Sequence, residues 1–199
     1  LPAFGDVVGW TYRKDWFNRA DLKSEFKGKY GRELDVPNSL AELKDIAEFF
    51  QGREIDGKTV YGAAINTERG SEGITMGVTN ALYNFGFEYN NPNKPYDLDG
   101  FVNSDGAVAG LEYYKALYDC CTPPGSSDWY MSENIDAYKS GQVALQMNFA
   151  FIWPGVHADS NVGGDKSGYF PNPAGPGGHF AQLGGCLLYT SDAADEAIG

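Results

Sequence analysis

The sequence has few cysteines, few histidines, a shortage of basic residues and no long apolar run. Three cysteines among 199 residues are too few for a disulfide framework. Lys and Arg total 15 against 27 Asp and Glu, which gives a net charge of −12 and leaves no basic face for the phosphates of nucleic acid. No apolar stretch approaches the length of a membrane-spanning helix. The composition therefore argues against nucleic acid and anionic lipid as partners.

The scarce cysteines and histidines also lack the spacing of a metal or redox site. Cys120 and Cys121 are adjacent, and adjacent cysteines rarely bridge each other because the ring is strained. We expect them to be separate, small, buried residues at the end of a helix. His157 and His179 have no cysteine or paired carboxylate at metal-ligand spacing. Gly175–Gly178 lacks the lysine and strand of a phosphate-binding loop, so no cofactor is predicted.

Aromatic residues, in contrast, are abundant: 13 Tyr, 12 Phe and 4 Trp make up 15% of the chain. Most of these rings should fill the core. Those that remain on the surface would suit polar, sugar-like ligands, because such ligands present C–H faces to aromatic rings and hydroxyls to carboxylates.

Helical and strand patterns alternate along the chain and predict an α/β architecture. Ser39 and Glu42 have the spacing of a helix capping box, and Ser71 and Ser104 are expected to cap later helices. The apolar stripe of the helix over 105–119 should consist of Val108, Leu111, Tyr114 and Leu117 or Tyr118. The expected elements are an extended run over 4–12, a polar flexible stretch to 37, a helix from 40 to about 50, a strand over 59–65, helices over 72–85, 105–119 and 132–140, and a strand over 142–148.

The segment around the last strand is the most informative. Gly141 stands where a helix C-cap favours positive φ, and a buried strand with alternating side chains follows it. Phe151 and Trp153 then fall in a loop bounded by Pro and Gly, where function is commonly carried and where two rings are difficult to bury.

Six blocks, in order and covering nearly all of 4–185, resemble bacterial extracellular solute-binding proteins of family 1, the sugar-binding partners of ABC importers. The likeness is to the maltodextrin-binding type. It departs from the family at Leu40, where tryptophan is common, and at Cys186. The blocks are Tyr12–Asp15, Pro37–Leu43, Asp56–Gly62, Val102–Ser104, Leu111–Tyr114 and Ala137–Asn148.

The sequence of the last residues differs in its pattern from the rest of the chain. Cys186–Glu196 resembles one reading frame of a transposase adapter used in shotgun library preparation. We therefore expect 186–199 to be a non-native tail and leave it out of the fold prediction.

The resemblance implies a type II periplasmic-binding-protein-like fold, in which hinge strands join two α/β lobes and ligand binds between them. It places 1–10 at the end of lobe one and the hinge, 11–168 in lobe two, and 169–185 in the crossing back to lobe one. The chain is then a fragment that contains mainly the second lobe.

The resemblance also suggests where ligand binds. Asp6, six residues before Tyr12, matches a ligand-binding carboxylate of maltodextrin-binding relatives, although a turn aspartate is an equal alternative. Trp10 could face the cleft or the core, and the core is favoured. Gly184 and Gly185 resemble the last cleft segment, where missing side chains let the backbone approach ligand.

The remaining candidates lie in lobe two. Thr67, Glu68 and Arg69 follow a strand at a junction where the family places ligand contacts; a solvated loop with an exposed ion pair is equally compatible. Phe151 and Trp153 match positions where relatives place stacking aromatics.

Three functions are compatible with these residues. The favoured one is a non-enzymatic, monomeric receptor, periplasmic or extracellular and with or without a lipid anchor. It closes on a carbohydrate and presents it to the transmembrane subunits of an ABC permease. A glycoside hydrolase would need a carboxylate pair drawn from Asp6, Glu68 and Glu72. A lectin-like module would bind without hinge closure.

Overall fold

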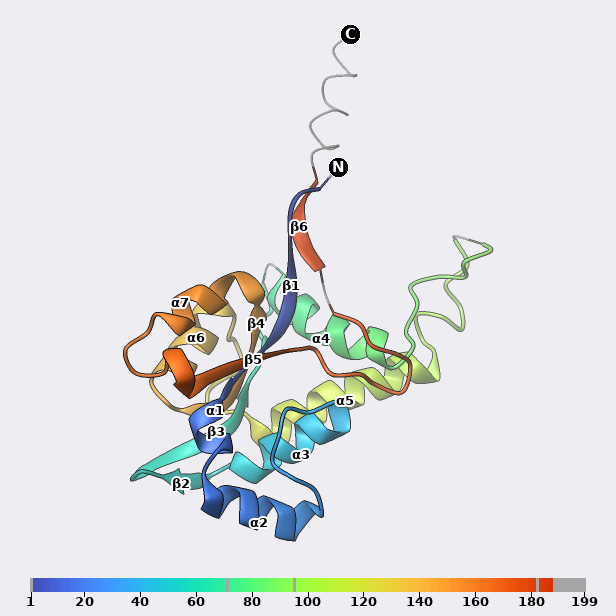
Figure 1. Cartoon of the computed structure of the whole chain (residues 1–199). Coiled ribbons are helices and arrows are strands. Elements are labelled where there is room, and N and C mark those ends of the chain that lie inside the picture. The colour runs from blue at the N-terminus through green and yellow to red at the C-terminus, as the bar shows by residue number, and fades with distance from the viewer. Residues whose placement is uncertain (1, 71, 95, 182, 188–199) are drawn as a thin grey trace.

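The computed structural model describes residues 2–70, 72–94, 96–181 and 183–187 (Figure 1). The α-helices are α1 (Lys14–Phe17), α2 (Ala20–Tyr30), α3 (Leu40–Phe50), α4 (Gly73–Asn84), α5 (Asp105–Cys121), α6 (Met131–Lys139) and α7 (Trp153–His157). The strands are β1 (Pro2–Arg13), β2 (Arg53–Ile55), β3 (Lys58–Ala64), β4 (Val143–Phe149), β5 (Ser167–Pro171) and β6 (Leu183–Leu187). Short 3₁₀ turns occupy Ala150–Ile152 and Gly164–Lys166. Within these residues, no helix has the length and apolar composition needed to cross a lipid bilayer.

The strands form one mixed sheet in the order β2-β3-β4-β1-β5, and β6 adds to β1 outside this path. β3 and β4 are parallel, whereas β1 runs antiparallel to β4, β5 and β6. Helices cover both faces, with α6 on β4 and α3 on β3. The α/β architecture expected from the sequence is confirmed.

β1 takes part in two different pairings along its length. Its carboxyl-terminal half lies between β4 and β5, and its amino-terminal half pairs with β6. Figure 1 shows this second pair projecting away from the rest of the sheet. Such a projection suits two hinge strands, and the division at residues 10, 168 and 185 stays a prediction.

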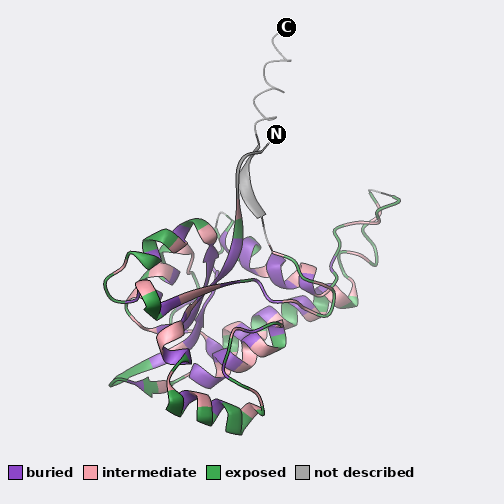
Figure 2. Ribbon diagram, viewed as in Figure 1, coloured by how far each residue is buried: buried purple, intermediate pink, exposed green. Residues whose placement is uncertain are grey.

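The sheet is buried on both faces (Figure 2). One hydrophobic cluster includes Trp10, Phe50 and Leu145, and a second includes Tyr138 and Val156. Every residue of β4 is buried. A strand that is covered on both faces reads as a nearly continuous apolar run, as β4 does.

Helix α3 begins as its sequence predicts. The Ser39 hydroxyl accepts a hydrogen bond from the backbone N–H of Glu42 at 3.2 Å. The Glu42 carboxylate reaches the N–H of Asn38 at 2.7 Å, one residue before the position that a standard capping box uses. The cap therefore fixes the start of the helix, and the predicted apolar face is buried.

Helix α5 begins at its predicted cap, Ser104, and the second half of its predicted apolar stripe is confirmed, because Tyr114 and Leu117 are buried. The first half is wrong, because Val108 and Leu111 are 49% and 50% exposed. In that half the buried face passes through small residues: at Gly110 a side chain would lie 3.0 Å from the Cα of Leu82 in α4. Close approach of the two helices there leaves Val108 and Leu111 on the outer face.

Other expectations require correction. The stretch expected to be flexible contains α2, which has only Leu22 and Phe26 buried and therefore a weak helical pattern. The residues expected to form a loop around Trp153 form a 3₁₀ turn and α7. β5 is a strand that was not among those expected from the sequence. The predicted cap Ser71 lies outside the described residues.

The cysteines and the tail also differ from expectation. Cys120 and Cys121 form a disulfide at the end of α5, so the prediction of two separate thiols is wrong. Cys121 is fully buried, as expected. β6 continues through Leu187, two residues into the segment left out as a tail. Residues 188–199 lie outside the described part of the chain.

Candidate functional site

One edge of the sheet gathers most of the candidate residues. β3 and β4 are parallel. β5 points in the same direction as β4, because both strands are antiparallel to β1. The carboxyl ends of all three strands therefore lie at one edge, called here the carboxyl edge. Ligands of open α/β sheets bind outside such an edge. The amino-terminal half of β1 passes the same edge.

Asp6 joins two of the segments that meet there. In the strand register it lies opposite Gly184 of β6. One carboxylate oxygen accepts a hydrogen bond from the backbone N–H of Phe151 at 3.0 Å, and the other accepts from Val7 at 2.8 Å. The side chain is partly exposed, and each oxygen has a further lone pair for a ligand hydroxyl. Asp6 therefore links β1 to the segment after β4.

Phe151, whose backbone N–H binds this carboxylate, has an exposed ring. It lies in the 3₁₀ turn after β4 and is 61% exposed. Its ring is stacked near that of Phe149, with centroids 6.1 Å apart and planes at 29°. An exposed ring on a residue bound to a carboxylate can pack against the C–H face of a polyhydroxylated ring while the carboxylate accepts from a hydroxyl.

The two tryptophan candidates have different environments. Trp10 has no exposed surface, so it leaves the candidate ligand set; its indole N–H donates to Asn172 at 3.0 Å. Trp153 is partly buried against Tyr169, with ring centroids 5.0 Å apart. At Gly9 an added side chain would lie 2.8 Å from the Trp153 ring, which shows how closely this indole packs on β1.

The three candidates after β3 have different environments. Thr67 is buried, and its hydroxyl oxygen accepts from the N–H of Trp129 at 2.9 Å. Arg69 is exposed and its backbone N–H donates to Asp128 at 3.3 Å. Oε2 of Glu68 is buried and has no hydrogen-bond partner among the described residues. Of the three, Glu68 has the unused acceptor.

The packing around Glu68 depends on Gly73, the first residue of α4. A side chain there would lie 2.8 Å from both Cβ and Oε2 of Glu68. The N–H of Ile74 also donates to the backbone carbonyl of Glu68 at 2.9 Å. The first turn of α4 therefore holds Glu68 in place.

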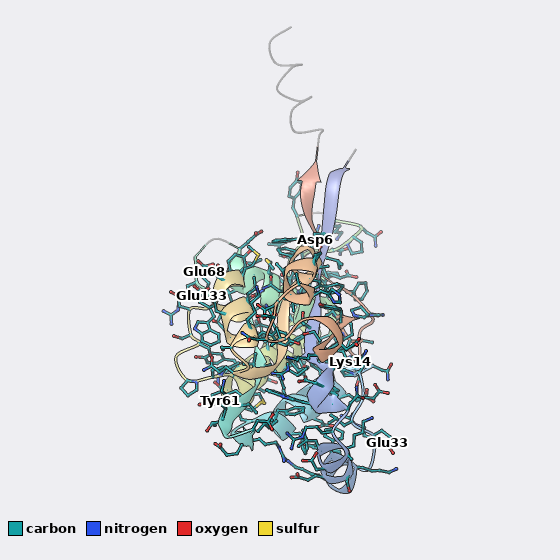
Figure 3. All side chains as sticks on the ribbon, turned by 60° about the vertical axis from the view of Figure 1, so that its left-hand side comes forward. Asp6, Lys14, Glu33, Tyr61, Glu68 and Glu133 are labelled. Carbon is teal, nitrogen blue, oxygen red and sulfur yellow. A yellow bond between two sulfur atoms is a disulfide. The ribbon has the colours of Figure 1, made fainter. Side chains whose placement is uncertain are left out.

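Tyr130, just before α6, is a neighbour that sequence reasoning missed. Its hydroxyl donates to Glu72 at 2.9 Å and its N–H donates to Glu133 at 3.1 Å. Burial, followed by the hydrogen bond to Glu72, raises the pKa of Tyr130, so its hydroxyl stays protonated and can donate. Glu68 and Glu133 are labelled on the same side of the view in Figure 3. The sequence signal that could have identified Tyr130 is the pair of aromatic residues, Trp129 and Tyr130, directly before the start of α6.

Gly184 and Gly185 lie in β6, opposite Asp6 and Gly5 of β1. The structure thus brings Asp6, Phe151 and the two glycines together, and it places Glu68 at the carboxyl end of the next strand of the sheet. Among the described residues there is no group of three His, Cys, Asp or Glu side chains that could hold a metal ion.

A mixed sheet with helices on both faces and a projecting pair of end strands is the architecture of one lobe of the sugar-binding proteins of ABC transporters, the family to which the sequence shows its resemblance. Maltose-bound MalE3 of T. maritima is similar over 100% of this chain and 48% of its own, with 25% identity and a TM-score of 0.70.

Other relatives agree with this fold. A solute-binding protein of Agrobacterium radiobacter K84 in complex with ribitol matches 100% of the chain and 47% of its own, at 24% identity and a TM-score of 0.67. A probable ABC transporter-binding protein of Deinococcus radiodurans is 24% identical over 188 residues, which are 92% of this chain and 43% of that protein. No family model matches. The chain spans less than half the length of these relatives.

Proposed function

We propose that this chain is part of the substrate-binding component of an ABC importer, which captures a sugar or polyol between two lobes and delivers it to a membrane permease. The observation that carries the proposal is the hydrogen bond from the backbone N–H of Phe151 to Asp6, which joins a residue with an exposed ring to a carboxylate at the carboxyl edge. Relatives with this fold were solved with maltose and ribitol.

The chemistry of the edge supports a ligand rich in hydroxyl groups. The Phe151 ring packs on C–H groups, while Asp6, Glu68 and the hydroxyl oxygen of Tyr130 accept hydrogen bonds from hydroxyls. Charge-assisted hydrogen bonds of this kind contribute about 1.5 to 3 kcal/mol each. The single lobe would offer only half of a cleft, so we expect weak binding by the chain alone.

The surrounding assignments belong to the same proposal. The chain acts as a monomer outside the cytoplasmic membrane, its partners are a carbohydrate and the permease subunits, and it carries out no catalysis. Residues 1–10 and 169–185 form the two crossings, and 11–168 form lobe two. Closure of the lobes then distinguishes loaded from empty receptor for the permease.

Titration of the ¹⁵N-labelled chain with maltose and with ribitol tests this proposal. We expect chemical-shift changes at Asp6, Glu68 and Phe151 for one of the two ligands. Phe151→Ala should weaken binding about five- to tenfold through loss of ring stacking. Phe180→Ala, which removes another half-exposed ring, is the matched control and should leave binding within twofold.

The alternative readings give different results in the same samples. A glycoside hydrolase would release glucose from maltose during prolonged incubation, whereas a receptor leaves the disaccharide intact. Shift changes away from the carboxyl edge, or equal effects of Phe151→Ala and its control, would reject the assignment of the site. Scattering of a chain that carries both lobes would show compaction with ligand for a receptor and none for a lectin-like module.

A further inference from the structure

A cavity of about 460 Å³ lies at the edge of the sheet opposite the candidate sugar site. It opens where β1 ends at Arg13, where the turn into β3 brings Lys58, and where α6 ends at Lys139. Trp16, Ile55 and Val162 form its apolar wall. None of these residues has a part in the proposed sugar site.

The charge of the lining is opposite to that of the whole chain. Acidic residues outnumber basic ones by 27 to 15 in the sequence. The cavity nevertheless has three cationic side chains, Arg13, Lys58 and Lys139, against one acidic side chain, Asp56. That carboxylate is already paired with Arg19 at 3.1 Å. Arg13 and Lys139 also pair with Asp15 and Asp159, just outside the lining. The donors left for an anion are therefore Lys58 and those N–H and ammonium groups of Arg13 and Lys139 that these pairs do not use.

Arg13 is the most constrained of the three cations. Its guanidinium lies over the ring of Trp16, 3.9 Å from the centroid, and its side chain is 11% exposed. Nε and Nη2 both donate to the Asp15 carboxylate, at 2.8 and 2.5 Å. Nη1 has no hydrogen-bond partner among the described residues. It faces Gly141, where an added Cβ would stand 3.4 Å away.

Neither of the two lysines makes a short ion pair with a described residue. Lys139 lies 3.6 Å from Asp159, a long ion pair. Lys58 makes no ion pair with any described residue and is exposed. Both ammonium groups can therefore turn toward a bound anion without breaking a strong contact.

The carboxyl end of a helix carries a partial negative charge that repels anions, but at the end of α6 this charge is reduced. The carbonyls of Asp136, Ala137 and Tyr138 accept hydrogen bonds from the N–H groups of residues 140, 142 and 141, each at 2.9 Å. Their negative partial charge is thus largely satisfied within the turn.

We propose that this cavity binds a small organic anion. Its carboxylate or phosphate group would contact Arg13 Nη1, Lys58 and Lys139, and its apolar body would lie on Trp16, Ile55 and Val162. The guanidinium supplies directional donors and the lysines supply point charges. The site is separate from the proposed sugar site and does not depend on it.

Benzoate, benzyl alcohol and acetate are suitable probes, because they separate the charge from the apolar body. Each is titrated into the ¹⁵N-labelled chain at constant ionic strength. We expect benzoate to shift the Trp16 indole N–H and the Gly141 amide in a saturable manner. Benzyl alcohol and acetate should each bind at least about fivefold more weakly.

The variant Lys58→Gln/Lys139→Gln should weaken benzoate binding about tenfold, because two charges next to the anion are lost. Lys29→Gln/Lys94→Gln removes two exposed lysines elsewhere and should leave it within twofold. The proposal is overturned if benzoate does not bind, if benzyl alcohol binds equally well, or if both double variants respond alike. Equal binding of acetate and benzoate would overturn the role of the apolar wall.

Discussion

The segment that leads into β6 is held by Asn84 at the end of α4, and replacing this residue gives a quantitative prediction. Asn84 is fully buried, and both ends of its amide contact the backbone of Phe180. Nδ2 donates to the Phe180 carbonyl at 2.8 Å, and Oδ1 accepts from the Phe180 N–H at 2.9 Å. Asn172 also donates to the same carbonyl at 2.9 Å.

These contacts set the cost of Asn84→Ala. The carbonyl of Phe180 keeps Asn172 as its donor, so only the Phe180 N–H loses its sole partner. Nδ2 also donates to the carbonyl of Asn80, so three hydrogen bonds are lost. At about 1 kcal/mol each, they predict a loss of about 3 kcal/mol in the free energy of unfolding. Urea denaturation followed by tryptophan fluorescence measures this change.

Hydrogen exchange provides the local assay. The Phe180 amide should exchange at least tenfold faster in Asn84→Ala, while the amides of β4 keep their protection. Asn93→Ala, in an exposed turn, is the matched control and should change stability by less than about 0.5 kcal/mol. A change that small in Asn84→Ala itself, together with an unchanged Phe180 amide, would refute the reasoning.

Three further predictions use other contacts. Gly62→Ala should destabilise the chain by about 1 to 3 kcal/mol, because the new Cβ would stand 2.2 Å from the Ala47 carbonyl oxygen. Gly28→Ala, in α2, places its Cβ where no atom lies within 4 Å and should stabilise the chain by about 0.5 to 1 kcal/mol. Urea denaturation measures both changes, and the opposite order of stability would contradict the packing at Gly62. The hydrogen bond from Arg19 lowers the pKa of Asp21 from its ordinary 3.8 to about 2. Because the folded-state pKa is the lower one, this contribution to stability is present above about pH 4 and is lost as the pH falls toward 2; an NMR titration should return the pKa of Asp21 to its ordinary range in Arg19→Gln, and an unchanged pKa would exclude this cause. A thiol reagent should modify one cysteine of the denatured chain before reduction and all three afterwards; three reactive thiols before reduction would exclude the Cys120–Cys121 bond.

Local signals in the sequence predicted local structure well. The caps at Ser39 and Ser104 were predicted because a hydroxyl and an N–H three residues later are determined by adjacent chain alone. The exposure of Phe151 followed from the residues next to it, although the loop proved to be a 3₁₀ turn. The resemblance to solute-binding proteins then gave the fold, which the comparisons confirm.

Contacts between distant segments could not be predicted in this way. Periodicity placed Val108 and Leu111 in the apolar stripe, but the approach of α4 at Gly110 decided which face of α5 is buried. The hydrogen bond from Phe151 to Asp6 joins residues 145 positions apart. The pairing of Tyr130 with Glu72 likewise requires the fold, and no pattern in either segment specifies the other.

The central position of β1 determines the order in which this molecule can be assembled. β1 precedes its partners β4, β5 and β6 in the sequence, so it is synthesised before all three of them. Until Val143 and the residues after it have left the ribosome, these partners cannot pair with β1 or cover its apolar side chains. Such long-range pairing slows folding and leaves an exposed strand that can join other chains. Newly made molecules should therefore depend on chaperones until β4, β5 and β6 are complete.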